Sequence, residues 1–278
     1  MSALLTYKSS KEGIGAQQQR ILSILAVSKV HGYRYVHRPI TVGHNYDNEP
    51  HWDDTWDAFF NIKQHSMCID PPSEAVYIER TGIILNDPSS LLPGSVAAAA
   101  VVPLTTHALS LMDNNPNLYY GSIIQEAREV YDATPKPLIL QDRTKTNIVI
   151  HYRTYNPHDD VGGGGIEPGG YRHVSQETYV KLVKTLNRKY TNHVIHIYTQ
   201  SSAQRDQLAS MPNSNIVWHV DTNTFQAFHH MVIADVLIMA KSSFSYVAGM
   251  YNSNNVYYFD FWHSPLKTWH NVNSLLSV

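Results

Sequence analysis

The sequence predicts an α/β protein built on parallel, doubly wound sheets, and three observations lead to that fold class. Apolar, strand-like runs alternate with helical patterns through the second half of the chain, from residue 147 to residue 259. The first half opens on a loop, a helix and a strand in the same order. Glycine, serine and arginine residues follow the expected strands, at the sheet edge where ligands bind in such folds.

The first half predicts one clear structural unit followed by irregular segments. Ile21, Leu22, Ile24, Leu25 and Val27 are spaced as the apolar face of a helix. In chain order we expect a glycine-rich turn at 12–17, a helix at 18–30 ended by Gly32, a strand at 33–36, a surface loop at 44–57, and short helices and strands over 58–132.

The second half predicts a regular series of elements, with Ser175 as the N-cap of its first helix. In chain order we expect a strand at 147–152, a helix at 176–190, strands at 193–198 and 216–220, a helix at 224–233, a strand at 236–240, a helix at 246–251 and a strand at 256–259. Pro135-Lys136-Pro137 and the polar run 141–147 indicate a linker. We therefore expect an N-terminal α/β domain at 1–140 and a C-terminal Rossmann-like domain at 141–278.

Composition excludes several classes of protein. Of 278 residues, 43% are hydrophobic and 16% charged, which argues against a collagen, a coiled coil or long disorder. Lys and Arg number 21 against 23 Asp and Glu, so a non-specific nucleic-acid binder is not expected. Cys68 is the single cysteine and forms no intramolecular disulfide. With no signal-peptide pattern and no apolar run near the ~20 residues of a membrane span, we expect a cytoplasmic protein.

Three patches are candidates for phosphate binding. Arg153 follows a buried strand, where its guanidinium can bind phosphate or pair with a loop carboxylate. The sequence 242–245, Ser-Ser-Phe-Ser, lies between a strand and a helix, where it can cap the helix or bind an anion. The sequence 13–17, Gly-Ile-Gly-Ala-Gln, is either a phosphate-binding turn or a plain tight turn, since it lacks the third glycine of GxGxxG.

The segment 154–173 holds four consecutive glycines, at 162–165, which favour a loop that closes over a ligand or a surface loop. Asp159, Asp160 and Glu167 in this segment are candidate general bases.

The 16 histidines raise the question of a metal. There is no HExxH motif and no Cys/His pair of zinc-finger spacing. His193 and His196 belong to opposite faces of a strand, and the neighbours His229 and His230 point apart on a helix. We therefore expect no metal and no cofactor. A GxSxG elbow is also missing, which disfavours an α/β-hydrolase.

The order of the patches 13–17, 151–153 (His-Tyr-Arg) and 234–245 resembles the fucosyltransferase-type group of GT-B glycosyltransferases, which covers the α1,2, α1,6 and protein O-fucosyl branches. The resemblance implies two Rossmann-like domains that face each other across a cleft. It assigns diphosphate binding to Arg153, Ser242, Ser243, Phe244, Ser245, Gly13, Gly15 and Gln17. It assigns the base or ribose to Tyr198, Thr199, Gln200 and Asp221. The sequence departs from the family at 154–156, Thr-Tyr-Asn, where a second Arg or Gly-Asp is expected.

The resemblance implies an inverting glycosyltransferase that acts on an oligosaccharide or glycoprotein acceptor. The Asp-x-Asp of metal-dependent transferases is missing, so Arg153 and helix-start amides would stabilise the leaving group. Short length and a Tyr/Asn/His-rich composition are similar to small glycosyltransferases of large algal viruses, which act in host cytoplasm. The donor is then GDP-fucose or UDP-xylose, and the aromatic segment 44–60 is a candidate acceptor surface.

Two rival functions stay open. One is a non-catalytic glycan- or nucleotide-binding module on a degenerate GT-B fold. The other is a Rossmann oxidoreductase, against which stand the missing third glycine and the lack of an acidic residue at the end of a second strand.

Overall fold

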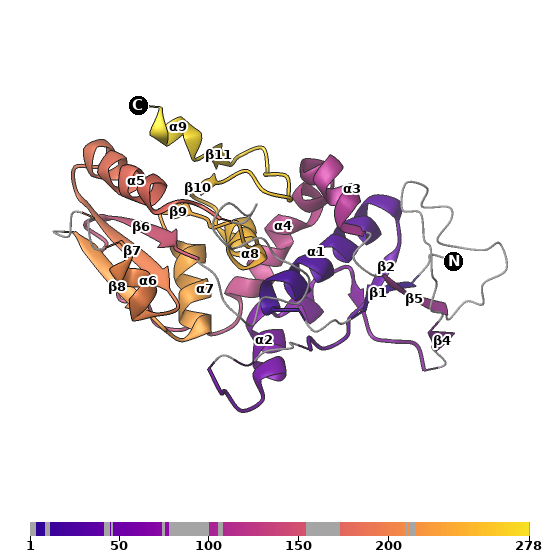
Figure 1. The fold of residues 1–278 in the computed structure, drawn as a ribbon. Helices are drawn as coiled ribbons and strands as arrows, with labels where there is room; N and C mark the ends of the chain where they lie inside the picture. The colour runs from indigo at the N-terminus through magenta and orange to yellow at the C-terminus, as the bar shows by residue number, and fades with distance from the viewer. Residues whose placement is uncertain are drawn as a thin grey trace. The chain divides into compact units, whose positions relative to one another are not determined.

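A computed structural model describes residues 4–8, 12–41, 45, 47–73, 76–77, 100–104, 108–153, 173–208, 211 and 215–277 (Figure 1). The chain divides into two compact units. Unit 1 comprises Met1–Lys136 together with Ser264–Leu266, and unit 2 comprises Pro137–His263 together with Lys267–Val278. The division after Lys136 falls within the Pro-Lys-Pro sequence, four residues before the expected boundary. The return of Ser264–Leu266 to unit 1, where the Ser264 N–H donates to Asp113 (3.2 Å), has no signal in the sequence.

Unit 1 contains a parallel sheet of five described strands in the order β3-β2-β1-β5-β4. The strands are β1 Leu4–Tyr7, β2 Arg34–Val36, β3 Cys68–Ile69, β4 Val76–Tyr77 and β5 Ala100–Leu104. The helical elements are α1 Ile14–His31, α2 Trp52–Phe60, the 3-10 helix η1 Ile62–Gln64, α3 Ala108–Asn114 and α4 Pro116–Asp132. The order along the sheet reverses between β1 and β5, so the turn that follows β1 lies at a topological switch point.

Helix α1 begins at Ile14, four residues before the position expected from the sequence. Gly13 is its N-cap, so the expected glycine-rich turn is shorter and Gly15 and Gln17 belong to the first helical turn. At the other end Gly32 adopts φ +72°, a left-handed conformation that glycine accepts readily, and ends the helix as expected.

The prediction of a surface loop over 44–57 is wrong for residues 52–57, because α2 begins at Trp52. Trp52, Trp56, Phe59 and Phe60 recur at helical spacing and are all buried. The Trp56 ring stacks on Phe60 with centroids 5.4 Å apart, and Phe59 meets Tyr131 of α4 edge-on at 5.3 Å. The rings of these four residues belong to the hydrophobic core of unit 1. The prediction that they bind acceptor sugars is therefore wrong for them.

Unit 2 contains a parallel sheet of six described strands in the order β11-β10-β9-β6-β7-β8. The strands are β6 Thr146–His151, β7 His193–Thr199, β8 Ile216–Val220, β9 Val236–Ile238, β10 Asn255–Tyr258 and β11 His270–Asn271. The helices are α5 Gln176–Lys189, α6 Ser202–Asp206, α7 Thr224–Ile233, α8 Ser243–Tyr251 and α9 Asn273–Leu276. Numbered from β6, this is the Rossmann order 3-2-1-4-5-6, and the predicted doubly wound α/β fold is confirmed.

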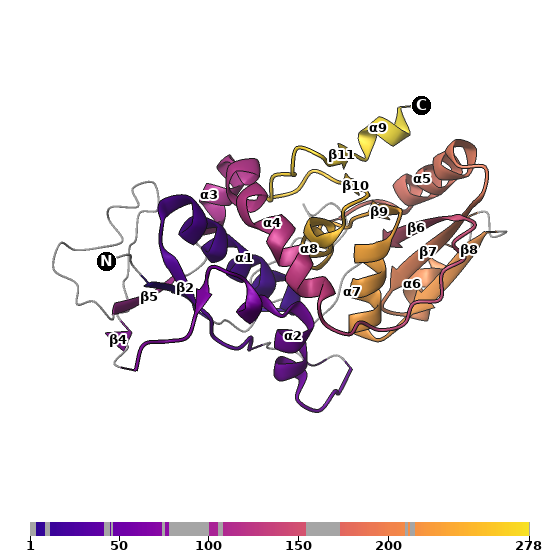
Figure 2. The same cartoon turned by 180° about the vertical axis from the view of Figure 1, so that it is seen from behind.

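The two faces of this sheet carry different residues because side chains alternate along each strand. Ile148, Ile150, Ile195 and Ile197 pack with the buried face of α5 in one apolar core. The opposite face, which includes His151, His196 and Tyr198, lies towards α7 and α8, and these two helices pack against each other (Figure 2). As expected, the Ser175 hydroxyl caps α5 by accepting a hydrogen bond from the Thr178 N–H (3.3 Å).

Within the part of the chain that the structure describes, no helix combines the length and the apolar character that crossing a membrane requires.

Candidate functional site

The candidate site in unit 2 lies at the point where the strand order of its sheet reverses. On one side of β6 the sheet continues with β7 and then β8. On the other side of β6 it continues with β9. The chain after β6 carries Arg153, and the chain after β9 carries Ser242. A guanidinium Nη1 of Arg153 donates to the Ser242 Oγ across 3.3 Å. In open parallel sheets this edge, outside the carboxyl ends of the two central strands, is where ligands bind.

The turn between β9 and α8 is held by its own serines. The Ser242 Oγ accepts a hydrogen bond from the Phe244 N–H (3.3 Å) and caps α8. The hydroxyl of Ser245 is fully buried and bonds both polar groups of Ala240, accepting from its N–H (3.1 Å) and donating to its carbonyl (3.3 Å). Ser245 therefore fixes the shape of the turn. Ser243 is the first residue of α8 and is half-buried, next to the Arg153–Ser242 pair in the chain.

This arrangement is suited to an anion. The first N–H groups of a helix lack partners in the helix and carry a partial positive charge, and α8 is nine residues long. Arg153 adds a full positive charge and a fork of donors that matches phosphate oxygens. Two adjacent phosphates, as in a nucleoside diphosphate, would engage both the fork and the helix start.

Phe244 and His151 lie beneath this edge, on the α7 side of the sheet. The Phe244 ring meets His151 at 5.8 Å and Phe228 of α7 at 5.4 Å between centroids. Burial, and then the nearby Arg153, lower the pKa of His151 to about 3. A ring that stays neutral to such acidic pH is a poor general base, so the residue below this edge is an uncharged histidine.

Tyr198, Thr199 and Gln200 close strand β7 as the sequence predicts, and their polar groups are partly used within unit 2. The Thr199 hydroxyl donates to the buried Gln204 Oε1 (2.6 Å), which also accepts from the Gln200 N–H (2.9 Å). Asp221 is exposed, and its N–H donates to the Thr199 carbonyl (3.0 Å). The ends of β7 and β8 therefore lie side by side, with Asp221 available for the base or ribose contact that stays a prediction.

In unit 1, the turn at 13–17, which is predicted to bind the diphosphate, follows β1 at the switch point of that sheet. The Gly13 carbonyl accepts from the N–H groups of Ala16 (3.1 Å) and Gln17 (3.2 Å). Gly15 and Gln17 are buried, and the Gln17 amide donates to the Glu12 carbonyl (3.4 Å). That this turn and Arg153 bind the same diphosphate stays a prediction.

Gly13 itself offers a test of close approach by a ligand. It has φ −67°, which any residue adopts, and a Cβ there would meet no atom within 4 Å. We expect Gly13→Ala to change the free energy of unfolding by less than about 1 kcal/mol. If a diphosphate contacts this backbone, we expect Gly13→Ala to lower diphosphate affinity about 10-fold, which is the cost of one lost contact. Calorimetric titration measures that affinity.

Gly121 of α4 is the matched control, because a Cβ there also meets no atom within 4 Å. We expect Gly121→Ala to leave diphosphate affinity unchanged. Equal affinity of Gly13→Ala and the unmodified protein would remove Gly13 from the site.

The candidate catalytic bases Asp159, Asp160 and Glu167 belong to residues 154–172, which lie outside the described residues. Their roles stay predictions.

Sequence reasoning missed a group of three histidines in unit 2. His196 of β7, His219 of β8 and His230 of α7 come together on the α7 side of the sheet. No spacing motif marks them, because they belong to three separate elements and only the packing of α7 on the sheet brings them into contact.

No family model matches the sequence, and no curated protein matches it. Among solved structures with a similar fold is the NodZ alpha-1,6-fucosyltransferase co-crystallised with GDP, at 12% identity and a TM-score of 0.47, covering 94% of this chain and 96% of that one. The E. coli heptosyltransferase WaaC with ADP is similar at 9% identity and a TM-score of 0.48, covering 100% and 98%. POFUT1 in complex with GDP-fucose is similar at 9% identity and a TM-score of 0.47, covering 94% and 98%.

Proposed function

We propose that this chain is an inverting, metal-independent glycosyltransferase. It would move fucose or xylose from GDP-fucose or UDP-xylose to a hydroxyl of an oligosaccharide or glycoprotein acceptor. The observation that carries the proposal is the hydrogen-bonded pair of Arg153 and Ser242, beside the start of α8, at the β6/β9 switch point of a Rossmann-ordered sheet. The motif resemblance at 13–17, 151–153 and 234–245 supports it, because two of these patches form this edge.

The proposed reaction is a single displacement. The acceptor oxygen forms a bond to the anomeric carbon of the sugar while the bond from that carbon to the diphosphate oxygen breaks. The acceptor proton passes to a carboxylate, for which Asp159, Asp160 and Glu167 are the candidates. The electron pair stays on the departing diphosphate, whose growing charge Arg153 and the first N–H groups of α8 stabilise.

The experiment that tests the proposal is calorimetric titration of the protein with GDP, UDP and ADP, with and without EDTA. We expect one of these nucleotides to bind with micromolar affinity, and EDTA to leave that affinity unchanged. GDP would favour fucosyl transfer, and UDP would favour xylosyl transfer. Binding followed by no transfer from any matching sugar donor would favour a non-catalytic nucleotide-binding module. Binding of none of the three would contradict the site.

A further inference from the structure

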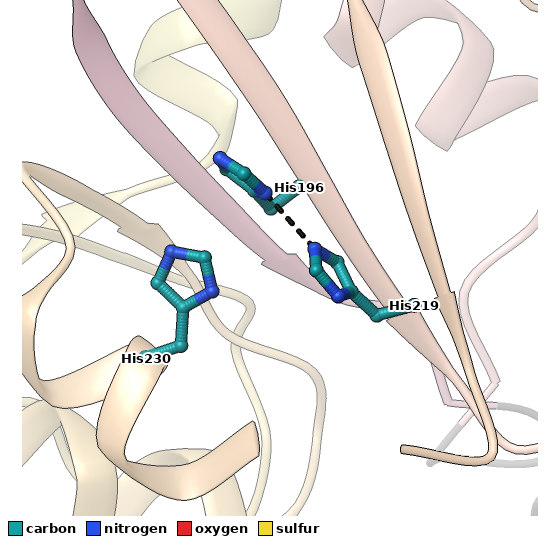
Figure 3. Close-up of side chains that lie close together, drawn as sticks. All are labelled: His196, His219 and His230. Atoms are coloured by element: carbon teal, nitrogen blue, oxygen red, sulfur yellow. Dashed lines mark hydrogen bonds between the residues drawn. The ribbon is translucent and has the colours of Figure 1, made fainter. Parts of the chain in front are cut away.

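Three imidazole rings come together inside unit 2. They belong to residues other than the Arg153–Ser242 pair of the candidate site. His196 is in the middle of β7, His219 is on the neighbouring strand β8, and His230 is on α7 (Figure 3). Each ring offers one nitrogen, and the three nitrogens lie within 4.8 Å of one another. Tetrahedral zinc, with Zn–N bonds of about 2.0–2.1 Å, holds its ligand nitrogens roughly 3.4 Å apart. Small ring rotations would close the group around one ion.

Two of the three rings have a nitrogen that protein groups leave unused. The Nε2 atoms of His196 and His230 are buried and, within the described part of the chain, accept or donate no hydrogen bond. His196 is 7% and His230 is 1% exposed, so water does not readily replace the missing partner. A buried polar atom without a partner costs free energy, which metal coordination after a rotation of the ring would recover.

Hydrogen bonds and ring stacking hold the three rings in orientation. The Tyr198 hydroxyl lies 2.8 Å from His230 Nδ1. The Tyr198 ring stacks on His219 at 4.3 Å with an angle of 6° between planes. His196 Nδ1 is hydrogen-bonded to His219 Nε2 (2.9 Å). Tyr198 comes from outside the group, and metal-binding histidines are usually fixed by such an outer partner.

Burial keeps these rings neutral, the state in which imidazole binds a metal. It lowers the pKa of His196 to about 4 and that of His230 to about 3, with the neighbouring imidazoles as the next cause for both. The set contains no carboxylate and no thiolate. Neutral imidazole ligands suit zinc, copper, nickel or cobalt, whereas magnesium, calcium and manganese prefer oxygen ligands.

We propose that His196, His219 and His230 form a site for one divalent transition-metal ion, with zinc as the reference metal. The ion would tie β7 and β8 to α7 and stabilise unit 2. The proposal is separate from the transferase proposal, because none of the three histidines is assigned to the donor or to the transfer step.

The test uses the full chain, freed of any histidine tag and treated with EDTA, then titrated with ZnCl2 by calorimetry. We expect one Zn²⁺ per chain and a rise of several degrees in the melting temperature on zinc binding, because the ion binds the folded state. Co²⁺ should give the strong visible absorption of a four-coordinate site. Loss of an outer partner typically costs 10–100-fold in metal affinity, so loss of a ligand by His230→Asn or His219→Asn should cost at least about 100-fold.

Two further variants make the test specific. His229→Asn alters the neighbouring histidine on α7 and should retain full zinc affinity. Tyr198→Phe removes the hydroxyl next to His230 Nδ1 and should weaken zinc binding about 10-fold, as loss of an outer partner does. The EDTA-treated proteins are compared by circular dichroism, so that a misfolded variant is recognised before titration.

The proposal is overturned if the unmodified protein binds no stoichiometric zinc, or if His229→Asn weakens binding as much as His230→Asn. Because His219 is half-buried, His219→Asn gives a decisive result even if His230→Asn fails to fold. Nucleotide binding by the zinc-free protein tests the transferase proposal separately, so the failure of one proposal leaves the other to be judged by its own titration.

Discussion

Replacing Arg153 with glutamine is expected to lower kcat/KM for the proposed sugar transfer by 10²–10³-fold, because the diphosphate that departs in that reaction would lose its charged donor. Removal of one preorganised donor to developing negative charge typically costs about 10²–10³ in rate. Glutamine keeps some polar reach but has neither the positive charge nor the fork of N–H groups. The measurement is transfer from the donor whose nucleotide binds in calorimetry, with the nucleotide affinity of the variant determined in parallel.

The fold should tolerate the change. The bond from Arg153 to the Ser242 hydroxyl is 3.3 Å long, near the upper limit for a hydrogen bond, and Ser242 also caps α8 through the Phe244 N–H. Arg153→Lys keeps the charge without the fork and should fall between the glutamine variant and the unmodified protein.

Arg205 provides the matched control. It lies on α6 in the same unit, is exposed, and pairs with Asp206 at 2.9 Å. We expect Arg205→Gln to retain full activity and affinity. If Arg153→Gln binds the diphosphate as tightly as the unmodified protein, the phosphate site lies elsewhere. If it loses diphosphate affinity while the unmodified protein transfers no sugar, the non-catalytic module becomes the better explanation.

The sequence predicts unit 2 well because its signals are local and repeated. Each strand from β6 to β10 is an apolar run next to a helix with a clear cap or face, and the order of such pairs implies a parallel sheet. Arg153 and Ser242 are 89 residues apart, and only the strand order places them together. That order follows from the doubly wound pattern, which explains why the sequence could anticipate that these two residues lie at the same sheet edge.

Unit 1 was harder to predict for physical reasons. Strands β3 and β4 have two residues each, too few for an alternating pattern to emerge. Helix α2 follows a polar segment, so the sequence alone predicts that its aromatic residues form a surface. The histidine group in unit 2 was missed for a different reason. Its members are separated by 23 and 11 residues and carry no motif, so their meeting depends on tertiary packing alone.

Acid is expected to destabilise unit 2 partly through His151, and the sign follows from its pKa. The pKa of the folded-state ring is lowered to about 3, chiefly by burial and then by Arg153, whereas an unfolded histidine has a pKa near 6.5. Above about pH 7.5 both states are neutral and the ring contributes nothing to the pH dependence. Below pH 6.5 the unfolded state takes up a proton that the folded state does not, so stability falls as pH falls, until the folded ring titrates.

Because of His151, we expect the free energy of unfolding to fall by about 2 kcal/mol between pH 6.5 and pH 4.5. This is less than the full effect of about 1.36 kcal/mol per pH unit, because the side chain is partly exposed. Urea unfolding followed by tryptophan fluorescence, with EDTA present, gives the free energy of unfolding at each pH. His151→Leu removes the titrating ring while leaving its neighbours in place.

The informative quantity is the difference in unfolding free energy between His151→Leu and the unmodified protein. Other groups, among them His196, His230 and the carboxylates, are present in both proteins, so their contributions cancel. From pH 7 to pH 8 the difference should change little, since the ring is mostly neutral in both states. It should then shift in favour of His151→Leu as the pH falls below 6.5, with a slope approaching one proton. Parallel curves from pH 7.5 to pH 4.5 would mean that the ring accepts a proton in the folded state. The edge beside Arg153 would then carry a second positive charge in mild acid, and nucleotide affinity should rise there instead of the stability falling.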